Sequence, residues 1–386
     1  MDMSITTKRI RVCHIVTRLA VRGVPRHVID MAAGLDPVKF AVEILTGHSE
    51  ANEGDLWQEA VDRGLSVVRV ESMHRRVNLR SDVSALWRIY RHLRRSPCDI
   101  VHTHISKAGI LGRLAAHKAG VPIVLHTYHG VPAEWEGGGR AARVFRYCEM
   151  RAARSTDTLV AVSHAVKSAL REMSIGKDSH WQVIYNGVAP SFFEPPAISP
   201  PIGDPLLLAI GSLTREKGID VLIGALPKLR QEHPALRLCL VGDGPLREEL
   251  ERQVAQLGLG DCVHFAGIVQ DVRPWLQRCT LLIAPSLNEG MGLAAVEAMA
   301  MKRPVIASGV GGLLEVVEDG QTGRLVIPGD LNILAEEIHA LLRDPAECIR
   351  LGGNGRERAR QYFSLEQSVN QLQDLYERLV SERGLR

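Results

Sequence analysis

The sequence predicts an α/β protein made of two doubly wound domains, each built on a parallel sheet. The chain has 386 residues, 45% apolar and 24% charged, which is a globular composition with enough length for two cores. Short β-rich apolar runs alternate with amphipathic stretches along both halves. A proline-rich stretch separates the two halves.

The first domain is predicted to span residues 1–189, with short strands rich in aliphatic side chains and helices between them. This alternation is typical of βαβ units, whose strands run parallel. The predicted strands are 9–16, 41–47, 66–70, 99–104, 123–128, 158–163 and 183–186. The predicted helices are 24–34, 53–63, 80–95, 109–119, 140–154 and 165–173.

Residues 190–205 are predicted to form a linker, because six prolines from Pro190 to Pro205 remove backbone donors and disfavour helix. The second domain then spans 206–364 and repeats the scheme. Its predicted strands are 206–211, 237–242, 263–267, 281–286, 304–308 and 324–327. Composition leaves open which domain the last predicted helix, within 365–386, packs against; packing back on the first domain is one arrangement.

The charge differs between the two halves. Residues 1–190 carry 27 Lys and Arg against 18 Asp and Glu, whereas the remainder carries 20 against 26. The basic half favours phosphates, anionic lipid or another acidic partner. Nucleic acid is not expected, because the 17 aromatic residues form no stacking series.

Several classes of protein are excluded by what the sequence lacks. No apolar run approaches the roughly 20 residues of a membrane-spanning helix, and we expect no signal peptide. Seven scattered cysteines without a CxxC fit a cytoplasmic protein. The GxGxxG, P-loop, DxD and HExxH motifs are absent, so no metal site is predicted. His102 and His104 share one strand face, where hydrogen bonding or packing is favoured over metal binding.

The most informative segment is 281–330, where a buried strand leads into a glycine loop and an alanine-rich helix. The loop carries Glu289, and Glu297 follows two turns into the helix. Glycines let a ligand approach the backbone, and the unpaired N–H groups at a helix start bind anions. Carboxylates accept strong hydrogen bonds from hydroxyl groups. This pattern predicts a phosphate and sugar site, with a plain turn before a buried helix as the alternative.

These motifs resemble family 4 of the retaining glycosyltransferases. The carriers are SLNEGMGLAAVEAMA, PVIASGVGGLLE and TGRLVIPGD. In the first half, DIVHTHISKAGILGRLAAHKAGVPIVLHTYHG and TLVAVSHAVK are similar to the subgroup that builds bacterial surface polysaccharides. The resemblance covers nearly the whole chain. It implies the GT-B fold, in which two Rossmann-like domains face a central cleft.

The resemblance also implies roles for residues on the donor side. Glu297 would hold the nucleotide ribose, and Glu289 would touch the donor sugar. Lys217, in GSLTREKG, would pair with the diphosphate, a role that fits the charge of the leaving group. Sugar hydroxyls and phosphate would bind the backbone of Gly290, Met291, Gly292 and Leu293.

On the other side, the resemblance places His129 near the transferred carbon and Gly23 in the first glycine loop, beneath the phosphates or the acceptor. The chain departs from the family at two places. Arg22 precedes Gly23 where members often have a glycine pair. Ser212 follows Gly211 where many members have an arginine that meets the diphosphate, and Arg215 is the candidate substitute.

The expected activity is therefore metal-independent, retaining transfer of a hexose or N-acetylhexosamine from a nucleotide sugar, UDP-linked in most members. The expected acceptor is a lipid-linked saccharide of an exopolysaccharide, capsule or lipopolysaccharide pathway. Retention in this family is attributed to same-face attack assisted by the leaving phosphate, so no protein nucleophile and no cofactor are expected. A nucleotide-sugar 2-epimerase and a silent nucleotide-sugar-binding partner are the alternatives.

Residues 69–95 hold eight arginines, and Val83, Leu86, Trp87 and Tyr90 form part of an apolar stripe at helical spacing that ends at Leu93. One interpretation is a core-facing stripe with a solvated basic back. The other is a basic face that meets anionic lipid at the inner face of the cell membrane.

Overall fold

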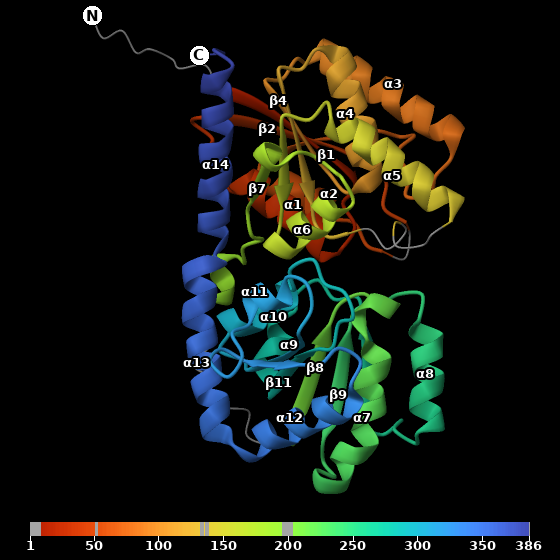
Figure 1. Ribbon diagram of the computed structural model, residues 1–386, viewed down its shortest axis with the longest axis vertical. Coiled ribbons are helices and arrows are strands. Elements are labelled where there is room, and N and C mark those ends of the chain that lie inside the picture. Colours follow the sequence, from red (N-terminus) through yellow and green to blue (C-terminus); the bar gives the residue numbers. More distant parts are fainter. Residues whose placement is uncertain (1–8, 51–52, 132–134, 136–138, 195–203, 386) are drawn as a thin grey trace, which may run out of the picture. The chain divides into compact units, whose positions relative to one another are not determined.

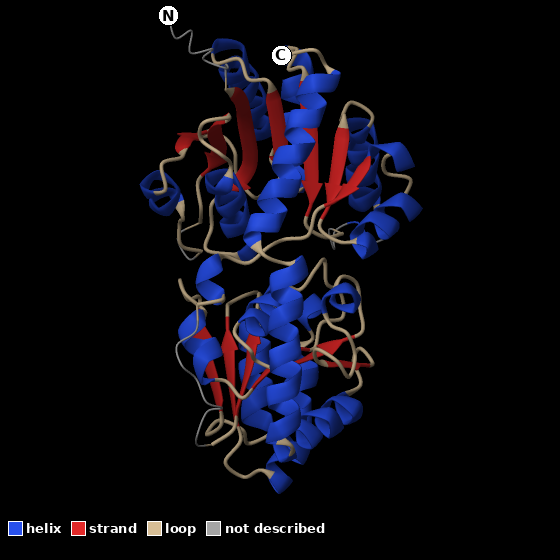
Figure 2. Cartoon of the chain, turned by 90° about the vertical axis from the view of Figure 1, so that its left-hand side faces the viewer, coloured by secondary structure: helices blue, strands red, loops and turns tan. Residues whose placement is uncertain are grey.

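The computed structural model describes residues 9–50, 53–131, 135, 139–194 and 204–385. Backbone contacts divide the chain into two units, one formed by Met1–Tyr185 with Leu365–Arg386 and the other by Asn186–Ser364. In each unit, helices cover both faces of one parallel sheet (Figure 1, Figure 2). The α/β class with two doubly wound parallel sheets, predicted from the sequence, is confirmed.

The sheet of the first unit has seven strands in the order β3-β2-β1-β4-β5-β6-β7. The order reverses between β1 and β4, which pair in parallel with His14 opposite His102. The strands are β1 (Ile10–Arg18), β2 (Phe40–Gly47), β3 (Ser66–Arg69), β4 (Ile100–His104), β5 (Ile123–Tyr128), β6 (Thr158–Ala161) and β7 (Trp181–Val183).

Two layers of helices cover this sheet. They are α1 (Gly23–Gly34), α2 (Trp57–Asp62), α3 (Leu79–Arg95), α4 (Ser106–Ala119), α5 (Arg140–Ala153), α6 (His164–Glu172) and α14 (Leu365–Glu382). Side chains alternate between the faces of a strand. Cys13 and Ile15 of β1 therefore join the core under α3 and α4, whereas Val16 joins the core under α1. His14 points to the same face as Val16.

Helix α14 packs on α1 of the first unit, although α14 lies at the far end of the chain. The Gln373 side chain accepts a hydrogen bond of 2.7 Å from the backbone N–H of Asp36, and Lys39 pairs with Glu377 at 2.9 Å. The Tyr376 hydroxyl reaches Nδ1 of His102 at 2.6 Å. The C-terminal helix is thus part of the first unit's core.

The second unit has a six-stranded parallel sheet in the order β10-β9-β8-β11-β12-β13. Its strands are β8 (Leu206–Ile210), β9 (Arg237–Val241), β10 (Val263–Gly267), β11 (Leu281–Ala284), β12 (Val305–Ser308) and β13 (Arg324–Val326). Its helices are α7 (Ile219–Glu232), α8 (Arg247–Gln256), α9 (Arg273–Arg278), α10 (Leu293–Ala300), α11 (Leu313–Val316), α12 (Leu331–Arg343) and α13 (Pro345–Tyr362). Leucines of α7 and α12 fill the core against β8 and β9.

The boundary between the units differs in detail from the prediction. The second unit begins at Asn186, and Pro190–Phe192 form a short 3₁₀ turn rather than linker. Arg356 of α13 donates to the carbonyl oxygen of Phe193, which holds this segment to the second unit. The predicted linker's residues 195–203 lie outside the described residues. The last strand of the first unit is Trp181–Val183 rather than 183–186, because the buried Trp181 pairs with Leu159 of β6.

The apolar stripe predicted on α3 is divided between core and solvent. Ala85, Ile89 and Leu93 face the core, with Leu86 and Tyr90 packed at its edge. Val83 and Trp87 were predicted within that stripe, but they are 57% and 54% exposed, and Leu79 on the same helix is 80% exposed. Within the described part of the chain, no helix is both long enough and apolar enough to cross a membrane.

The core of the first unit contains an unusual number of buried imidazoles. Burial lowers the pKa of His14 and of His27 to about 4 and that of His129 to about 3. Burial, together with neighbouring charges, holds the pKa of three more well below the usual range; these are His102, His104 and His126. The folded unit therefore keeps these rings neutral where the unfolded chain would protonate them.

We expect the first unit to lose stability as the pH falls from about 6.5 to about 4. In that window the unfolded chain binds more protons than the folded chain, so the free energy of unfolding falls as the pH falls. A histidine whose pKa drops from 6.5 to about 4 contributes a loss of about 2 kcal/mol at pH 5. Hydrogen exchange at pH 7.5 and pH 5 measures the loss of stability separately for each unit. Protection should fall for the amides of β1 and β4 more than for those of β8 and β11; an equal fall in both sheets would contradict the assignment.

Candidate functional site

Two loops of the second unit meet where the order of its strands reverses. In an open parallel sheet, this point is where ligands bind, because the chain leaves the two neighbouring strands toward opposite faces. The loop after β8 contains a 3₁₀ turn, Arg215–Lys217, and the loop after β11 leads to α10. The backbone N–H groups of Leu287 and Asn288 both donate to the carbonyl oxygen of Glu216, at 2.7 and 3.2 Å. The two loops are therefore held together.

A single ion pair joins the side chains of these loops. Nζ of Lys217 lies 2.5 Å from Oε2 of Glu289, and the Ser286 hydroxyl donates to the same oxygen at 3.2 Å. Both charged side chains are largely buried, with 28% of Lys217 and 14% of Glu289 exposed. An anionic ligand would compete with Glu289 for the ammonium group, so the pair is a candidate anion site.

Glycines let these loops pack closely. Gly218 has a φ of +59°, and a Cβ there would lie 2.1 Å from the carbonyl oxygen of Pro285. Gly311 has a φ of +49°, and a Cβ there would lie 2.0 Å from the carbonyl oxygen of Glu289. The backbone N–H of Gly312 donates to that same oxygen at 3.1 Å. These contacts fix the backbone on either side of Glu289.

Helix α10 begins directly after this loop. Its N-cap, Gly292, is in the left-handed region, and no side chain caps the helix. The first N–H groups and the helix dipole therefore favour an anion. The side chain of Met291 is buried, with its sulfur accepting from the backbone N–H of Asn186 at 3.0 Å, so Met291 offers a ligand only its backbone. Glu297 is half-buried, just over one turn into α10.

The first unit has the corresponding reversal between β1 and β4. Gly23 is the first residue of α1, and Arg22 before it pairs with Glu53 at 3.1 Å. Arg18 makes two hydrogen bonds to the same carboxylate, at 2.5 and 2.8 Å. Burial would raise the pKa of Glu53, but the two arginines outweigh it and hold that pKa below its usual value. The arginine in place of a glycine is thus tied to a buried carboxylate.

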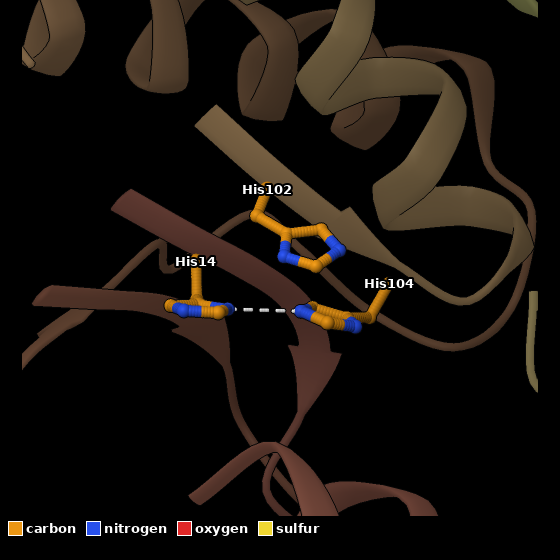
Figure 3. A group of neighbouring side chains, drawn as sticks. All are labelled: His14, His102 and His104. Atoms are coloured by element: carbon orange, nitrogen blue, oxygen red, sulfur yellow. Dashed lines mark hydrogen bonds between the residues drawn. The ribbon is translucent and has the colours of Figure 1, made fainter. Parts of the chain in front are cut away.

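His129 follows β5 and ends a line of hydrogen-bonded imidazoles. Its Nε2 lies 3.3 Å from Nδ1 of His104, and Nε2 of His104 lies 2.9 Å from Nδ1 of His14. Figure 3 shows His14 and His104 meeting edge to edge, with the ring of His102 beside them. His104 ends β4 and His129 follows β5, so this end of the line lies at the carboxyl edge of the sheet, whereas His14 lies in the middle of β1.

The trio of His14, His102 and His104 has a spacing that a metal ion could use, because one ring nitrogen from each lies within 4.8 Å of the others. The hydrogen bonds argue against that use. Both nitrogens of His102 are engaged, by Tyr376 at 2.6 Å and by the Thr127 hydroxyl at 2.7 Å. The trio contains no carboxylate or thiolate to offset the charge of a buried cation. The imidazoles fit hydrogen bonding better than metal binding.

The structure distributes the predicted site residues between the two units. Lys217, Glu289, Gly290, Met291, Gly292, Leu293 and Glu297 lie on the two loops and α10 of the second unit, and Arg215 is exposed in the same 3₁₀ turn. Gly23 and His129 lie in the first unit. Neither a role for His14 nor the pairing of Lys217 with Glu289 was predicted from the sequence. His14 could have been noticed in the sequence as a histidine within the apolar predicted strand RIRVCHIV, where a polar ring needs a hydrogen-bond partner.

Two family models match most of the chain. The model described as "Glycosyltransferase Family 4" matches residues 21–192, and the one described as "Glycosyl transferases group 1" matches residues 204–344. The second range contains the strand reversal between β8 and β11 with its two loops, and the first range begins after β1 and contains α1, β4 and His129.

Comparison with curated proteins gives the same family. The chain is 32% identical over 286 residues to an uncharacterised glycosyltransferase of Methanocaldococcus jannaschii, covering 73% of this chain and 76% of that protein. It is 28% identical over 389 residues to an Escherichia coli enzyme named UDP-Gal:alpha-D-GlcNAc-diphosphoundecaprenol alpha-1,3-galactosyltransferase, covering 97% and 98%.

Among solved structures, the chain is similar to sucrose-phosphate synthase from Thermosynechococcus elongatus. The TM-score is 0.84 with 25% identity, over 97% of this chain and all of the other. Together with the family models and the relatives, this similarity shows that the chain belongs to the group 1, family 4 glycosyltransferases and is a transferase of the GT-B fold.

Proposed function

We propose that this glycosyltransferase moves a hexose or N-acetylhexosamine from a UDP-sugar to a lipid-linked saccharide, in the synthesis of exopolysaccharide, capsule or lipopolysaccharide. Transfer retains the anomeric configuration and needs no metal. The observation that carries the proposal is the Lys217–Glu289 pair beside the uncapped start of α10. The Escherichia coli relative, named for a UDP-galactose donor and a diphosphoundecaprenol-linked acceptor, supports the choice of substrates.

The residues of the second unit suit a nucleotide diphosphate as leaving group. When the donor binds, its diphosphate takes the place of the Glu289 carboxylate on Lys217, and the start of α10 adds backbone donors. Glu289 is then released to accept hydrogen bonds from sugar hydroxyls. Glu297, on the same helix, is proposed to hold the ribose. Positive charge fixed in advance stabilises the phosphate as it leaves, which is the work a metal would otherwise do.

The chemical step exchanges one bond at the anomeric carbon. The acceptor oxygen forms a bond to that carbon from the same face on which the bond to the diphosphate oxygen breaks. The bonding electron pair leaves with the nucleotide diphosphate, whose oxygen takes the proton of the acceptor hydroxyl. No protein nucleophile is required, and His129 and Gly23 are proposed to contact the substrates.

We expect Lys217→Ala to lower nucleotide release from the correct donor by about 10²–10³-fold, the cost of one charged contact to the leaving group. Glu297→Ala should raise KM for the donor, because it removes a ribose contact. Release from UDP-, GDP- and ADP-sugars, with EDTA present, measures both effects. Lys228→Ala is the matched control, since Lys228 pairs with Glu336 on the exposed surface of α7 and α12.

Three outcomes would contradict the proposal. Loss of activity in EDTA would contradict metal independence. If Lys217→Ala were as active as Lys228→Ala, the proposed role of the Lys217–Glu289 ion pair would be wrong. A sugar converted to its epimer without any acceptor would favour a 2-epimerase instead.

We further propose that Arg215 replaces the arginine that other members carry at the position of Ser212. Arg215 is exposed in the turn that ends at Lys217, so its guanidinium can approach the same phosphates. Arg215→Ala should lower turnover by about 10²-fold. Ser212→Arg in that background should recover most of the loss. If the double variant unfolds at the normal temperature but does not regain turnover, Arg215 does not replace the arginine that other members carry.

Helix α3 is the proposed contact with the cytoplasmic face of the membrane. Leu79, Val83 and Trp87 recur every four residues on one exposed face, and the guanidinium of Arg91 lies 4.3 Å from the centre of the Trp87 ring. The exposed arginines of this helix include Arg80, Arg88, Arg94 and Arg95. Arginines flanking an exposed apolar face suit anionic lipid.

We expect the full chain to float with vesicles of anionic phospholipid and not with neutral vesicles. Each of Arg88→Ala and Arg94→Ala should weaken binding by about fivefold, which corresponds to about 1 kcal/mol per charge. Trp87→Ser should weaken it at every salt concentration, whereas the arginine variants should matter less at high salt. Arg237→Ala on the second unit is the control. The proposal would be contradicted if vesicle binding did not depend on salt concentration. It would also be contradicted if Arg237→Ala weakened binding as much as Arg88→Ala and Arg94→Ala do.

A further inference from the structure

The line of imidazoles in the first unit has two ends with no partner. Among the described residues, neither Nε2 of His14 nor Nδ1 of His129 finds a hydrogen bond, although both atoms are buried. Between them, His104 uses both nitrogens, one toward each neighbour. The three rings therefore form one chain of two hydrogen bonds, open at both ends.

Such a chain has only two internal arrangements when each ring is neutral. A neutral imidazole carries one N–H and one lone pair, so the donor direction at one bond dictates the direction at the next. Burial lowers the pKa of His14 and His129 and is the main cause of the low pKa of His104, so the neutral form holds near pH 7. Either Nδ1 of His129 carries the terminal proton, or Nε2 of His14 does.

Both end nitrogens are buried, but the positions of the two residues favour one of these arrangements. His14 is fully buried in the middle of β1, where an unpaired N–H is costly and an unpaired lone pair is less so. His129 lies just beyond the end of β5, at the carboxyl edge of the sheet, where the residue is partly exposed although its Nδ1 is buried. A substrate bound at this edge would give an N–H on Nδ1 its partner. The favoured arrangement thus has His14 donating to His104 and His104 donating to His129.

We propose that His14 and His104 are positioning residues, which through this chain hold the His129 ring in place with its proton on Nδ1, the nitrogen offered to an oxygen of the sugar substrate. The inference rests on the proposed function, because only a substrate at this edge gives Nδ1 its partner. His27 supports the same orientation from α1, with its ring edge-on to that of His129 at 6.0 Å between centroids. His102 is held separately by Thr127 and Tyr376 and takes no part in the chain.

The tautomer of His129 is measurable without any assay of transfer. Long-range ¹H–¹⁵N spectra of the full chain labelled at histidine distinguish a protonated Nδ1 from a protonated Nε2, and His129→Gln identifies the signals. We expect Nδ1–H in the unchanged protein. His14→Phe, which removes both nitrogens, should give a mixture of tautomers. His14→Asn, whose amide replaces Nδ1 and can donate to His104, should restore Nδ1–H.

Turnover provides the second readout. His14→Phe should lower kcat by about tenfold, by analogy with the loss of a partner that orients a metal-bound histidine, with little change in KM for the donor. The variant leaves His104 without its partner at Nε2, so the proton of His129 is no longer fixed. His14→Asn should recover most of that loss, whereas His14→Gln, whose amide lies at the position of Nε2, should not. Thermal unfolding of each variant checks that it is folded.

The inference would be overturned if His129 carried its proton on Nε2 in the unchanged protein. It would also be overturned if His14→Phe left the ratio of the two His129 tautomers unaltered. A stoichiometric metal ion bound through His14, His102 and His104 would also overturn it, because those nitrogens would then be ligands. If the tautomers behave as expected but no sugar is transferred from any donor, the proposed function fails while the hydrogen-bonded chain stands.

Discussion

The reversal of strand order in each parallel sheet is the constraint on which the candidate site depends. At β1 and β4, and again at β8 and β11, neighbouring strands send the chain toward opposite faces, and a ligand can bind at the carboxyl ends of these strands. Lys217 and Glu289 lie on the two loops of one reversal. His14 and His104 lie on the two strands of the other. A residue far away in sequence reaches its partner because the sheet brings these strands together.

The two reversals are built from different chemistry. The second unit uses an ion pair, glycines and a helix start, all of which act on negative charge. The first unit buries imidazoles that stay neutral, and it uses the Tyr376 hydroxyl of α14 to satisfy His102. Burying polar rings costs free energy unless their nitrogens are hydrogen-bonded, so the C-terminal helix is needed by the polar core as well as by the apolar core.

Much of this arrangement could be predicted from the sequence, because the strands and helices follow local apolar periodicity. The glycine loop from Glu289 to Gly292 was also predictable, since its residue types suit a close approach of backbone and ligand. Three features were not predictable. The Lys217–Glu289 pair depends on two loops 72 residues apart, and the hydrogen bond between His14 and His104 depends on the register of β1 against β4. The exposure of Trp87, placed by its spacing in the predicted apolar stripe, was not predictable because helical spacing alone does not say which residues of a stripe are covered.

The same contrast explains why the donor side is easier to predict than the acceptor side. A diphosphate is recognised by charge and by backbone N–H groups, and these require particular residue types at fixed spacing. A sugar hydroxyl is neutral and both donates and accepts, so selecting one oxygen among several takes a donor of fixed orientation, such as a neutral ring with a fixed N–H. Fixing that orientation takes several residues from different strands, none of which forms a short motif. On the proposed function, the selectivity of the first unit therefore lies in how His14, His104 and His129 are arranged relative to one another rather than in any one of them.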